Sequence, residues 1–422
     1  MRRWAAVLLL LGGATSRAEE APAALSLRDC FRRAAEKSET LALGETDVRQ
    51  VENQYALVRA GVLPQVGFRA SETWQDASGR SDSSSNPPRV RRSESGFYGR
   101  QTLFAGFREF AGMRAQSALR DSRQWGLARA RQLLYADVAE VYYTVLAYDA
   151  DRMALTTLGD LTDKRIADLT HRVRIGRSRE GERLSVRSQR ATLEARRRRA
   201  EGLRSSALEV LSVLVGETVL AVAEEPGDLP APEPVARWME KLPARPDLAA
   251  SERSVEAARF LYRARRREIW PSLVAAGNYY TQRSGGNAPI DWDATLSLDL
   301  PLFRGGAWRY GVRVAADDAE AARWRLARDR RSAESELRAR YAELLSARSE
   351  TEALLSAAEL AEANYNAQVR DYGLGLVTNL DVLTAMDTFQ EAKLSYDRRR
   401  LDARLGALRV AVAAGDVPEA AP

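Results

Sequence analysis

The chain has a single cysteine, Cys30, and a single histidine, His171. One cysteine excludes an intrachain disulfide. One cysteine and one histidine are too few of the usual ligands for a zinc site. A serine–histidine triad would depend on His171 alone, which lies in a charged helical stretch. We therefore expect no metal, no cofactor and no catalytic residues. We predict a first helix from Leu25 to Leu63 and predict that Cys30 is a small buried residue on it.

Proline is missing from two long stretches, residues 105–214 and 302–417. Because proline interrupts helices, both stretches can hold helices much longer than a globular domain needs. A helix of about 65 residues would span on the order of 100 Å. We predict that Gly176 ends the first long helix and Gly375 the second, since a helix reversal needs a residue that tolerates the left-handed backbone conformation.

Long apolar runs are also missing after the first twenty residues, so the sequence predicts no transmembrane helix. Residues 1–18 have the features of a secretory signal: Arg2 and Arg3, then a short apolar run, then small residues around a cleavage site. The mature chain would begin near Glu19, outside the inner membrane. It would then be secreted, periplasmic or an outer-membrane β-barrel, whose alternating strands escape a hydropathy scan.

Lysine is scarce, and the net charge of +6 comes almost entirely from arginine. Arginine runs at residues 196–199, 265–267 and 398–400 would suit nucleic acid. Each run is interleaved with Glu and Ala on a predicted helix, however, and an exported chain meets little nucleic acid. We interpret the runs as solvated helix faces and predict no nucleic-acid partner.

The sequence does contain stretches of period-two alternation, which predict β-strands. The clearest is Trp292–Leu302, whose roughly eleven residues match a strand tilted across a bilayer. We predict one hairpin over residues 65–104, with its second strand at Gly96–Phe104, and another hairpin over residues 272–302. The apolar face predicts lipid contacts for Trp292, Leu296, Leu298 and Leu300, and the polar face predicts that Asp293, Asp299 and Arg69 line a lumen.

The two hairpins belong to an internal duplication. Phe104 and Phe303 are 303 − 104 = 199 residues apart, while Pro64 and Pro271 are 271 − 64 = 207 apart, because the first loop is longer. Each repeat contains a helix, two strands, a long helix, a break and another helix. We divide the chain into a signal peptide (1–18), a first repeat (19–223), a Pro-rich linker (224–246), a second repeat (247–415) and a disordered tail (416–422). The linker is predicted to carry a short helix around Val235–Lys241.

Four strands cannot close a barrel, and unpaired strand edges cannot remain in lipid. Closure therefore needs several copies of the chain: two copies would supply eight strands, and three would supply twelve and leave a lumen. The alternative is a periplasmic or secreted coiled-coil structural protein without a pore, which leaves the membrane-length strands unexplained. An enzyme is least favoured, since no phosphate loop or nucleophile elbow is present.

Four motifs make the chain resemble the outer-membrane efflux protein family, the TolC-like channels. They are Leu63-Pro64-Gln65-Val66, Leu103-Phe104-Ala105-Gly106, Pro301-Leu302-Phe303-Arg304-Gly305-Gly306 and the segment from Tyr372 to Leu383. The resemblance implies a mainly α fold with a membrane β-barrel, in which a homotrimer forms a twelve-stranded barrel continued by a twelve-helix α-barrel.

The same resemblance implies a function. The chain would be a passive export duct in the outer membrane of a Gram-negative bacterium, with its helical part in the periplasm. It would work with a periplasmic adaptor protein and an inner-membrane transporter, in a tripartite efflux or type I secretion system. The transported substrate is left open.

The resemblance also implies residues of a periplasmic gate. Asp381 matches an acidic gate residue, and Glu182 is its counterpart in the first repeat. Thr384 stands where some members of the family carry a second acid. Tyr372 matches a position in the closed-state contacts, although it also suits the last apolar position of its helix.

A second interpretation of Asp381 comes from the residues themselves. Thr378-x-x-Asp381 has the pattern of a capping box at a helix N-terminus, so gating and capping both remain open at this point. On the family resemblance, the helix reversals at Gly176, Gly375, Leu376 and Thr378 are where an adaptor would dock.

Overall fold

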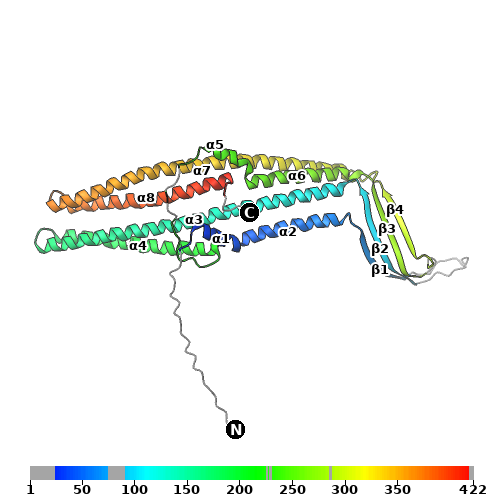
Figure 1. The fold of residues 1–422 in the computed structure, drawn as a ribbon, viewed down its shortest axis with the longest axis horizontal. Helices are drawn as coiled ribbons and strands as arrows, with labels where there is room; N and C mark the ends of the chain where they lie inside the picture. Colours follow the sequence, from blue (N-terminus) through cyan, green and yellow to red (C-terminus); the bar gives the residue numbers. More distant parts are fainter. Residues whose placement is uncertain (1–23, 75–90, 225–226, 228–230, 285–287, 418–422) are drawn as a thin grey trace, which may run out of the picture. The chain divides into compact units, whose positions relative to one another are not determined.

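The structure is a computed structural model that describes residues 24–74, 91–224, 227, 231–284 and 288–417 (Figure 1). The predicted signal peptide, residues 1–18, lies outside the described residues. In chain order the elements are α1 (Leu27–Lys37), α2 (Glu39–Ala60), β1 (Gln65–Trp74), β2 (Arg91–Ala105), α3 (Arg108–Arg174), α4 (Glu180–Val215), α5 (Val235–Lys241), η1 (Leu242–Ala244), α6 (Pro246–Arg266), η2 (Arg267–Ile269), β3 (Ser272–Arg283), β4 (Trp292–Asp299), α7 (Ala307–Leu374) and α8 (Asn379–Ala414).

This order contains the predicted repeat twice, as α2-β1-β2-α3-α4 and as α6-β3-β4-α7-α8. The two predicted long helices are present and contain 67 and 68 residues. The short helix predicted inside the Pro-rich segment is α5. Within the described part of the chain, no helix combines the length and the apolar character needed to cross a membrane.

The chain forms two compact units, and each unit draws on both repeats. The first, which we call the helix-end unit, takes in Met1–Lys37, Asp137–Pro230 and Ala347–Leu405. The second, which we call the sheet unit, takes in Ser38–Ala136, Ala231–Ser346 and Gly406–Pro422. The helix-end unit therefore holds both helix reversals, and the sheet unit holds all four strands.

The core of the helix-end unit is an apolar seam between four helices. In Figure 1, α4 lies along α3 and α8 lies along α7. Buried residues recur mostly at steps of three, four or seven along these helices, which is the spacing of a heptad-like seam. The buried residues of this core are Leu155, Leu158, Leu169, Val186, Leu193, Ala200, Tyr365, Tyr372, Val382, Ala385 and Met386.

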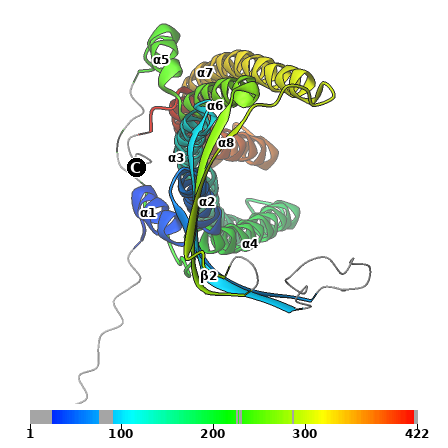
Figure 2. The same ribbon diagram turned by 90° about the vertical axis from the view of Figure 1, so that its right-hand side faces the viewer.

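The sheet unit contains one antiparallel sheet with the strand order β1-β2-β3-β4. Pairing of β2 with β3 joins the two predicted hairpins into a single surface. Each strand adjoins one of the helices α2, α3, α6 and α7, which lie in the same order as the strands (Figure 1), and the strands bend together (Figure 2). The outer strands β1 and β4 each have one free edge among the described residues.

The sequence predicts one helix from Leu25 to Leu63, and this prediction is wrong. The chain breaks at Ser38, which has extended backbone angles and caps α2, because its hydroxyl accepts a hydrogen bond from the Leu41 amide. Apolar spacing continues across the break, which hides it from a search for periodicity. Cys30 is fully buried on α1, as predicted.

Three predicted boundaries also need correction. The second strand begins at Arg91, before the predicted Gly96, because Arg91 pairs with Trp74 of β1. The fourth strand ends at Asp299, before the predicted Leu302, and Pro301, which has no N–H to donate to a ladder, follows it. The predicted tail at 416–422 begins with ordered residues: Asp416 pairs with Lys241 at 2.5 Å, and Val417 is buried. Residues 418–422 lie outside the described part.

Candidate functional site

The helix-end unit contains two helix reversals of the same design. Gly176 and Gly375 have φ angles of 75° and 78°, in the left-handed region. The Arg177 amide donates to the Arg172 carbonyl at 2.8 Å, and the Leu376 amide donates to the Asp371 carbonyl at 3.0 Å. These bonds satisfy carbonyl groups that a helix end leaves free. Both predicted reversals are therefore confirmed.

Next to the reversals, side chains from different helices form what we call the helix-end cluster. The Tyr372 hydroxyl, on α7, donates to the Glu182 carboxylate, on α4, at 2.7 Å. The Ser178 hydroxyl donates to the same carboxylate oxygen at 2.5 Å. The cluster therefore brings together two of the predicted gate residues, Glu182 and Tyr372, from opposite repeats.

Arg165 of α3 completes the cluster. Only 8 % of its surface is exposed, and its guanidinium carbon lies 3.8 Å from the centroid of the Tyr372 ring. One terminal nitrogen donates to the Asn379 side-chain oxygen at 3.1 Å. Arg172 lies over the same ring at 5.2 Å. A buried cation is costly to desolvate, and the aromatic face and the amide oxygen together offset part of that cost.

The pKa shifts within this cluster favour an ionised Glu182 and a neutral Tyr372. Burial acts to raise the pKa of Glu182, but hydrogen bonds from Ser178 and Tyr372 outweigh it, and the pKa is lowered overall. Burial raises the pKa of Tyr372, and the Glu182 charge adds to this effect. Burial lowers the pKa of Arg165. The carboxylate therefore accepts and the phenol donates.

Asp381 and Thr384 lie outside the cluster. Asp381 is exposed and accepts from the Thr378 amide at 2.7 Å and from the Thr378 hydroxyl at 2.6 Å. The Thr378 side chain, with its amide, lowers the pKa of Asp381. The Thr384 hydroxyl donates to the Leu380 carbonyl of its own helix at 3.0 Å. The capping box is therefore present at Asp381, whereas a gate role for either residue stays a prediction.

Sequence reasoning missed Arg165, Ser178 and Asn379. One signal for Arg165 was available, because Leu158, Thr162, Arg165 and Leu169 follow the spacing of four, three and four that marks the buried seam. A charged residue at such a position is rare unless it is paired. Ser178 and Asn379 carry no comparable signal, since polar residues are common at helix reversals.

The two faces of the sheet differ in character: one carries mainly aromatic and aliphatic residues, and the other carries polar residues together with Tyr98 and Tyr280. One row across the four strands is Phe68, Phe97, Tyr279 and Trp292, and the adjacent row is Gly67, Tyr98, Asn278 and Asp293. Because successive residues of a strand point to opposite faces, the two rows lie on opposite sides of the sheet.

The polar face contains the predicted lumen residues Asp293 and Arg69. The Asn278 amide nitrogen donates to Asp293 at 2.8 Å, and the Tyr280 hydroxyl donates to it at 2.7 Å. The Arg69 guanidinium lies 5.0 Å from the centroid of the Tyr98 ring. Asp299, at the end of β4, pairs with Ser272 and continues the alternation of Asp293.

The predicted lipid contacts lie on or beside the aromatic face. Trp292, Leu296 and Leu298 alternate along β4 and are 67 %, 66 % and 70 % exposed, and Leu300 follows the strand and is 51 % exposed. Such exposure of large apolar side chains in one row indicates that something apolar covers them. The assignment of this face to lipid and of the other to a lumen stays a prediction.

Comparisons with known proteins agree with this arrangement. A family model described as outer membrane efflux protein matches residues 240–415. The cobalt-zinc-cadmium resistance protein CzcC of Cupriavidus metallidurans is 26 % identical over 303 residues, which is 69 % of this chain and 70 % of CzcC. The family that matches is one of outer-membrane efflux channels rather than of enzymes.

Solved structures show the fold over nearly the whole chain. The outer membrane protein VceC of Vibrio cholerae has a TM-score of 0.81 at 18 % identity and covers 92 % of this chain and 96 % of its own. The open state of the outer membrane channel MtrE of Neisseria gonorrhoeae has a TM-score of 0.74 at 20 % identity, with 92 % and 89 % covered. The resemblance that the sequence motifs predict, to the outer-membrane efflux protein family of TolC-like channels, is therefore confirmed.

Proposed function

We propose that the chain is a passive export duct in the outer membrane of a Gram-negative bacterium, with its helical part in the periplasm. The observation that carries this proposal is the sheet, which has an aromatic face, a polar face and free outer edges at β1 and β4. Free edges cannot stay in lipid. Three copies would pair β1 of one chain with β4 of the next and close a twelve-stranded barrel, which twelve helices continue as an α-barrel.

In this proposal the helix-end cluster is a latch that holds the duct closed. Tyr372 and Arg165 join α7 to α3, and the Tyr372 hydroxyl joins α7 to α4 through Glu182. Opening the end of the tube requires these helix pairs to move apart, and each hydrogen bond to a charged group opposes that movement by roughly 1.5–3 kcal/mol. Asp381 would add negative charge at the entrance, where acidic rings favour cations.

We also propose that the reversals at Gly176 and Gly375 are the docking surface for a periplasmic adaptor, which connects the duct to an inner-membrane transporter. Leu374, Leu376 and Leu380 are each more than 70 % exposed around the second reversal. Exposed leucines clustered at a turn of otherwise polar helices suit a protein partner. Thr378 lies among them as the N-cap residue.

Single-channel conductance in a planar bilayer tests the duct and the latch together. We expect the wild type to conduct in brief openings, and Tyr372→Phe to increase the open probability because it removes the hydroxyl that binds Glu182. The matched control is Tyr365→Phe, which removes a hydroxyl from the same helix next to the stacked Phe389 ring and should leave gating unchanged. A wild type that conducts under no condition would contradict the duct.

The name of CzcC suggests the first cargo to test, namely cobalt, zinc and cadmium ions. We propose that divalent cations pass the polar face of the sheet, where Asp293 and Asp299 add negative charge. Asp299→Asn should then reduce the preference of the open channel for cations over anions. If the variant and the wild type have the same reversal potential in a salt gradient, Asp299 does not contribute to the ion selectivity of the channel.

A further inference from the structure

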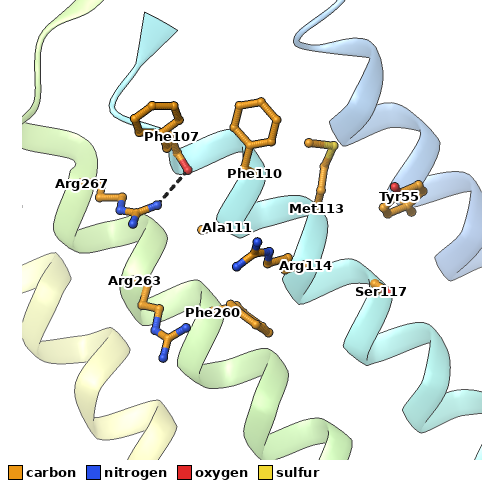
Figure 3. A pocket seen from close by; sticks show the side chains of 10 residues that line it. All are labelled: Tyr55, Phe107, Phe110, Ala111, Met113, Arg114, Ser117, Phe260, Arg263 and Arg267. Atoms are coloured by element: carbon orange, nitrogen blue, oxygen red, sulfur yellow. Dashed lines mark hydrogen bonds between the residues drawn. The ribbon is translucent and has the colours of Figure 1, made fainter.

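A groove of about 640 Å³ lies in the sheet unit, at the junction where β2 passes into α3 (Figure 3). Its walls come from α2, α3 and α6. The lining residues are Tyr55, Phe107, Phe110, Ala111, Met113, Arg114, Ser117, Phe260, Arg263 and Arg267. Four of these ten residues are aromatic, three are arginines and none is acidic.

The three arginines face the groove without a carboxylate partner among its lining residues. Arg114 and Arg263 lie over the Phe260 ring, at 5.9 and 5.3 Å from its centroid. Arg267 donates to the Phe107 carbonyl at 3.2 Å, as Figure 3 shows. The acids nearest in sequence, Glu109 and Glu268, pair with Arg108 and Arg265 instead. The groove therefore concentrates positive charge beside aromatic surface.

The aromatic side of the groove continues the apolar face of the sheet. Phe104 of β2 pairs with Leu273, and Leu273 pairs with Leu298, so these three residues share the face that carries the exposed leucines of β4. The Phe104 and Phe107 rings meet edge to face at 5.1 Å, and Phe107 and Phe110 follow at 6.1 Å. An apolar path therefore runs from the proposed lipid face into the groove.

Phe107 has a strained backbone conformation. Its φ of 59° lies in the left-handed region, which disfavours residues with a Cβ. In the second repeat the same position is Gly306, since 306 − 107 = 199, and it has a φ of 82°. The fold therefore accepts glycine here, yet the first repeat holds an exposed phenylalanine. Strain retained at one copy of a duplicated turn points to a role for the side chain.

Two of the three arginines are also confined to one junction, whereas Arg114 has a counterpart in Arg313 (313 − 114 = 199). With the offset of 207 residues, Arg263 and Arg267 correspond to Ala56 and Ala60 on α2, and with the offset of 199 Phe110 corresponds to Arg309 on α7. The duplicated fold does not require this combination of rings and charges. A ligand that is apolar on one side and anionic on the other would account for this combination of aromatic rings and arginines.

We propose that this groove binds the headgroup of an anionic phospholipid, whose acyl chains lie along the apolar face of the sheet. The proposal rests on the outer-membrane placement given above, which puts the strand–helix junction at the lipid–water boundary. Aromatic residues gather at such boundaries, and basic pockets beside them bind anionic lipid headgroups. The ligand chemistry is thus a phosphodiester with a net negative charge, attached to a hydrocarbon tail.

The test is native mass spectrometry of the detergent-purified full chain, titrated with phosphatidylglycerol or with phosphatidylethanolamine of the same acyl chains. We expect the wild type to retain phosphatidylglycerol preferentially. Because an arginine beside an anionic headgroup contributes about fivefold in affinity, Arg263→Gln/Arg267→Gln should reduce that retention by about 25-fold. The control, Arg304→Gln/Arg309→Gln, removes the same charge at the corresponding junction of the second repeat, where neither arginine lines the groove, and should leave the bound headgroup in place.

Phe107→Asn tests the aromatic part, since asparagine tolerates the left-handed conformation. It should reduce retention of both lipids. Equal retention of the two lipids by the wild type, or an equal loss in the control, would overturn the proposal. Displacement of the lipid by an equal concentration of glycerol phosphate would also overturn it.

Conductance of the same preparations separates the export duct from the lipid site. A channel that conducts but shows no lipid preference contradicts the lipid site alone.

Discussion

The two helix reversals share one turn but use their acidic residues in different ways. Asp381 folds back onto Thr378 and caps its own helix, whereas Glu182 reaches to Tyr372 on another helix. The cap residues explain the difference. Thr378 supplies a hydroxyl, but its counterpart in the first repeat is Arg179 (378 − 179 = 199), which makes no side-chain capping bond. Duplication thus produced one self-contained reversal and one that is linked across the helix bundle.

The largest effect should come from removing the cation that supports this link. Arg165→Ala removes the closer of the two arginines over the Tyr372 ring and the guanidinium that donates to the Asn379 side-chain oxygen, and we expect a loss of about 3 kcal/mol in the free energy of unfolding. Arg183→Ala is the control, because Arg183 pairs with Glu180 one turn away on the same helix. Such a pair contributes less than about 1 kcal/mol. Denaturant unfolding measures the loss of stability in each of the two variants. Equal losses would contradict a structural role for the cluster.

Both reversals share a glycine in the left-handed conformation, and substitution of these glycines tests that shared feature. Among the described residues, no heavy atom beyond the two chain neighbours lies within 4 Å of a Cβ placed at Gly176 or Gly375. Gly→Ala at either position therefore costs only the left-handed backbone, about 1–2 kcal/mol. Gly202→Ala, inside α4 and also in open space, should instead stabilise the chain by about 1 kcal/mol. Thermal unfolding of the three variants decides this. Clearly unequal costs at the two reversals would mean that the turns are not equivalent.

Local signals account for what the sequence predicts well. Gly375 and the pair Thr378 and Asp381 lie within seven residues of one another, and together they predict the reversal and the start of α8. Pro64 likewise predicts the boundary before β1. Each of these signals acts through the backbone of its own segment, so the local structure can be predicted without knowledge of the tertiary structure.

The cluster itself depends on distant pairings that no local pattern reveals. Tyr372 meets Arg165 from 372 − 165 = 207 residues away, and it meets Glu182 from the other repeat. Family resemblance supplied Glu182 and Tyr372 as separate residues but not their bond. The start of β2 at Arg91 was missed for a related reason: its first residues are polar, and pairing with β1 extends the strand where alternation does not.

Acid should weaken the linked reversal. The pKa of Glu182 is lowered from an ordinary value of 4.5, so its contribution is complete above that pH and is lost as the pH falls through the lowered pKa. We expect the open probability in a bilayer to rise under these acidic conditions. Asp381→Asn should retain this pH dependence and Glu182→Gln should lose it. If Asp381→Asn abolishes the pH dependence and Glu182→Gln retains it, the titrating group is Asp381 at the capped reversal.

The smallest expected effect is also the most direct test of the cap. Arg179→Thr gives the first reversal the hydroxyl that Thr378 gives the second, and a new cap should stabilise α4 by about 0.5–1 kcal/mol. The same hydroxyl would compete for the Glu182 carboxylate and weaken its bond with Tyr372. We therefore expect thermal stability and open probability to rise together, although stabilising changes usually restrict motion. If stability rises and gating is unchanged, the cap residue does not decide which partner Glu182 takes.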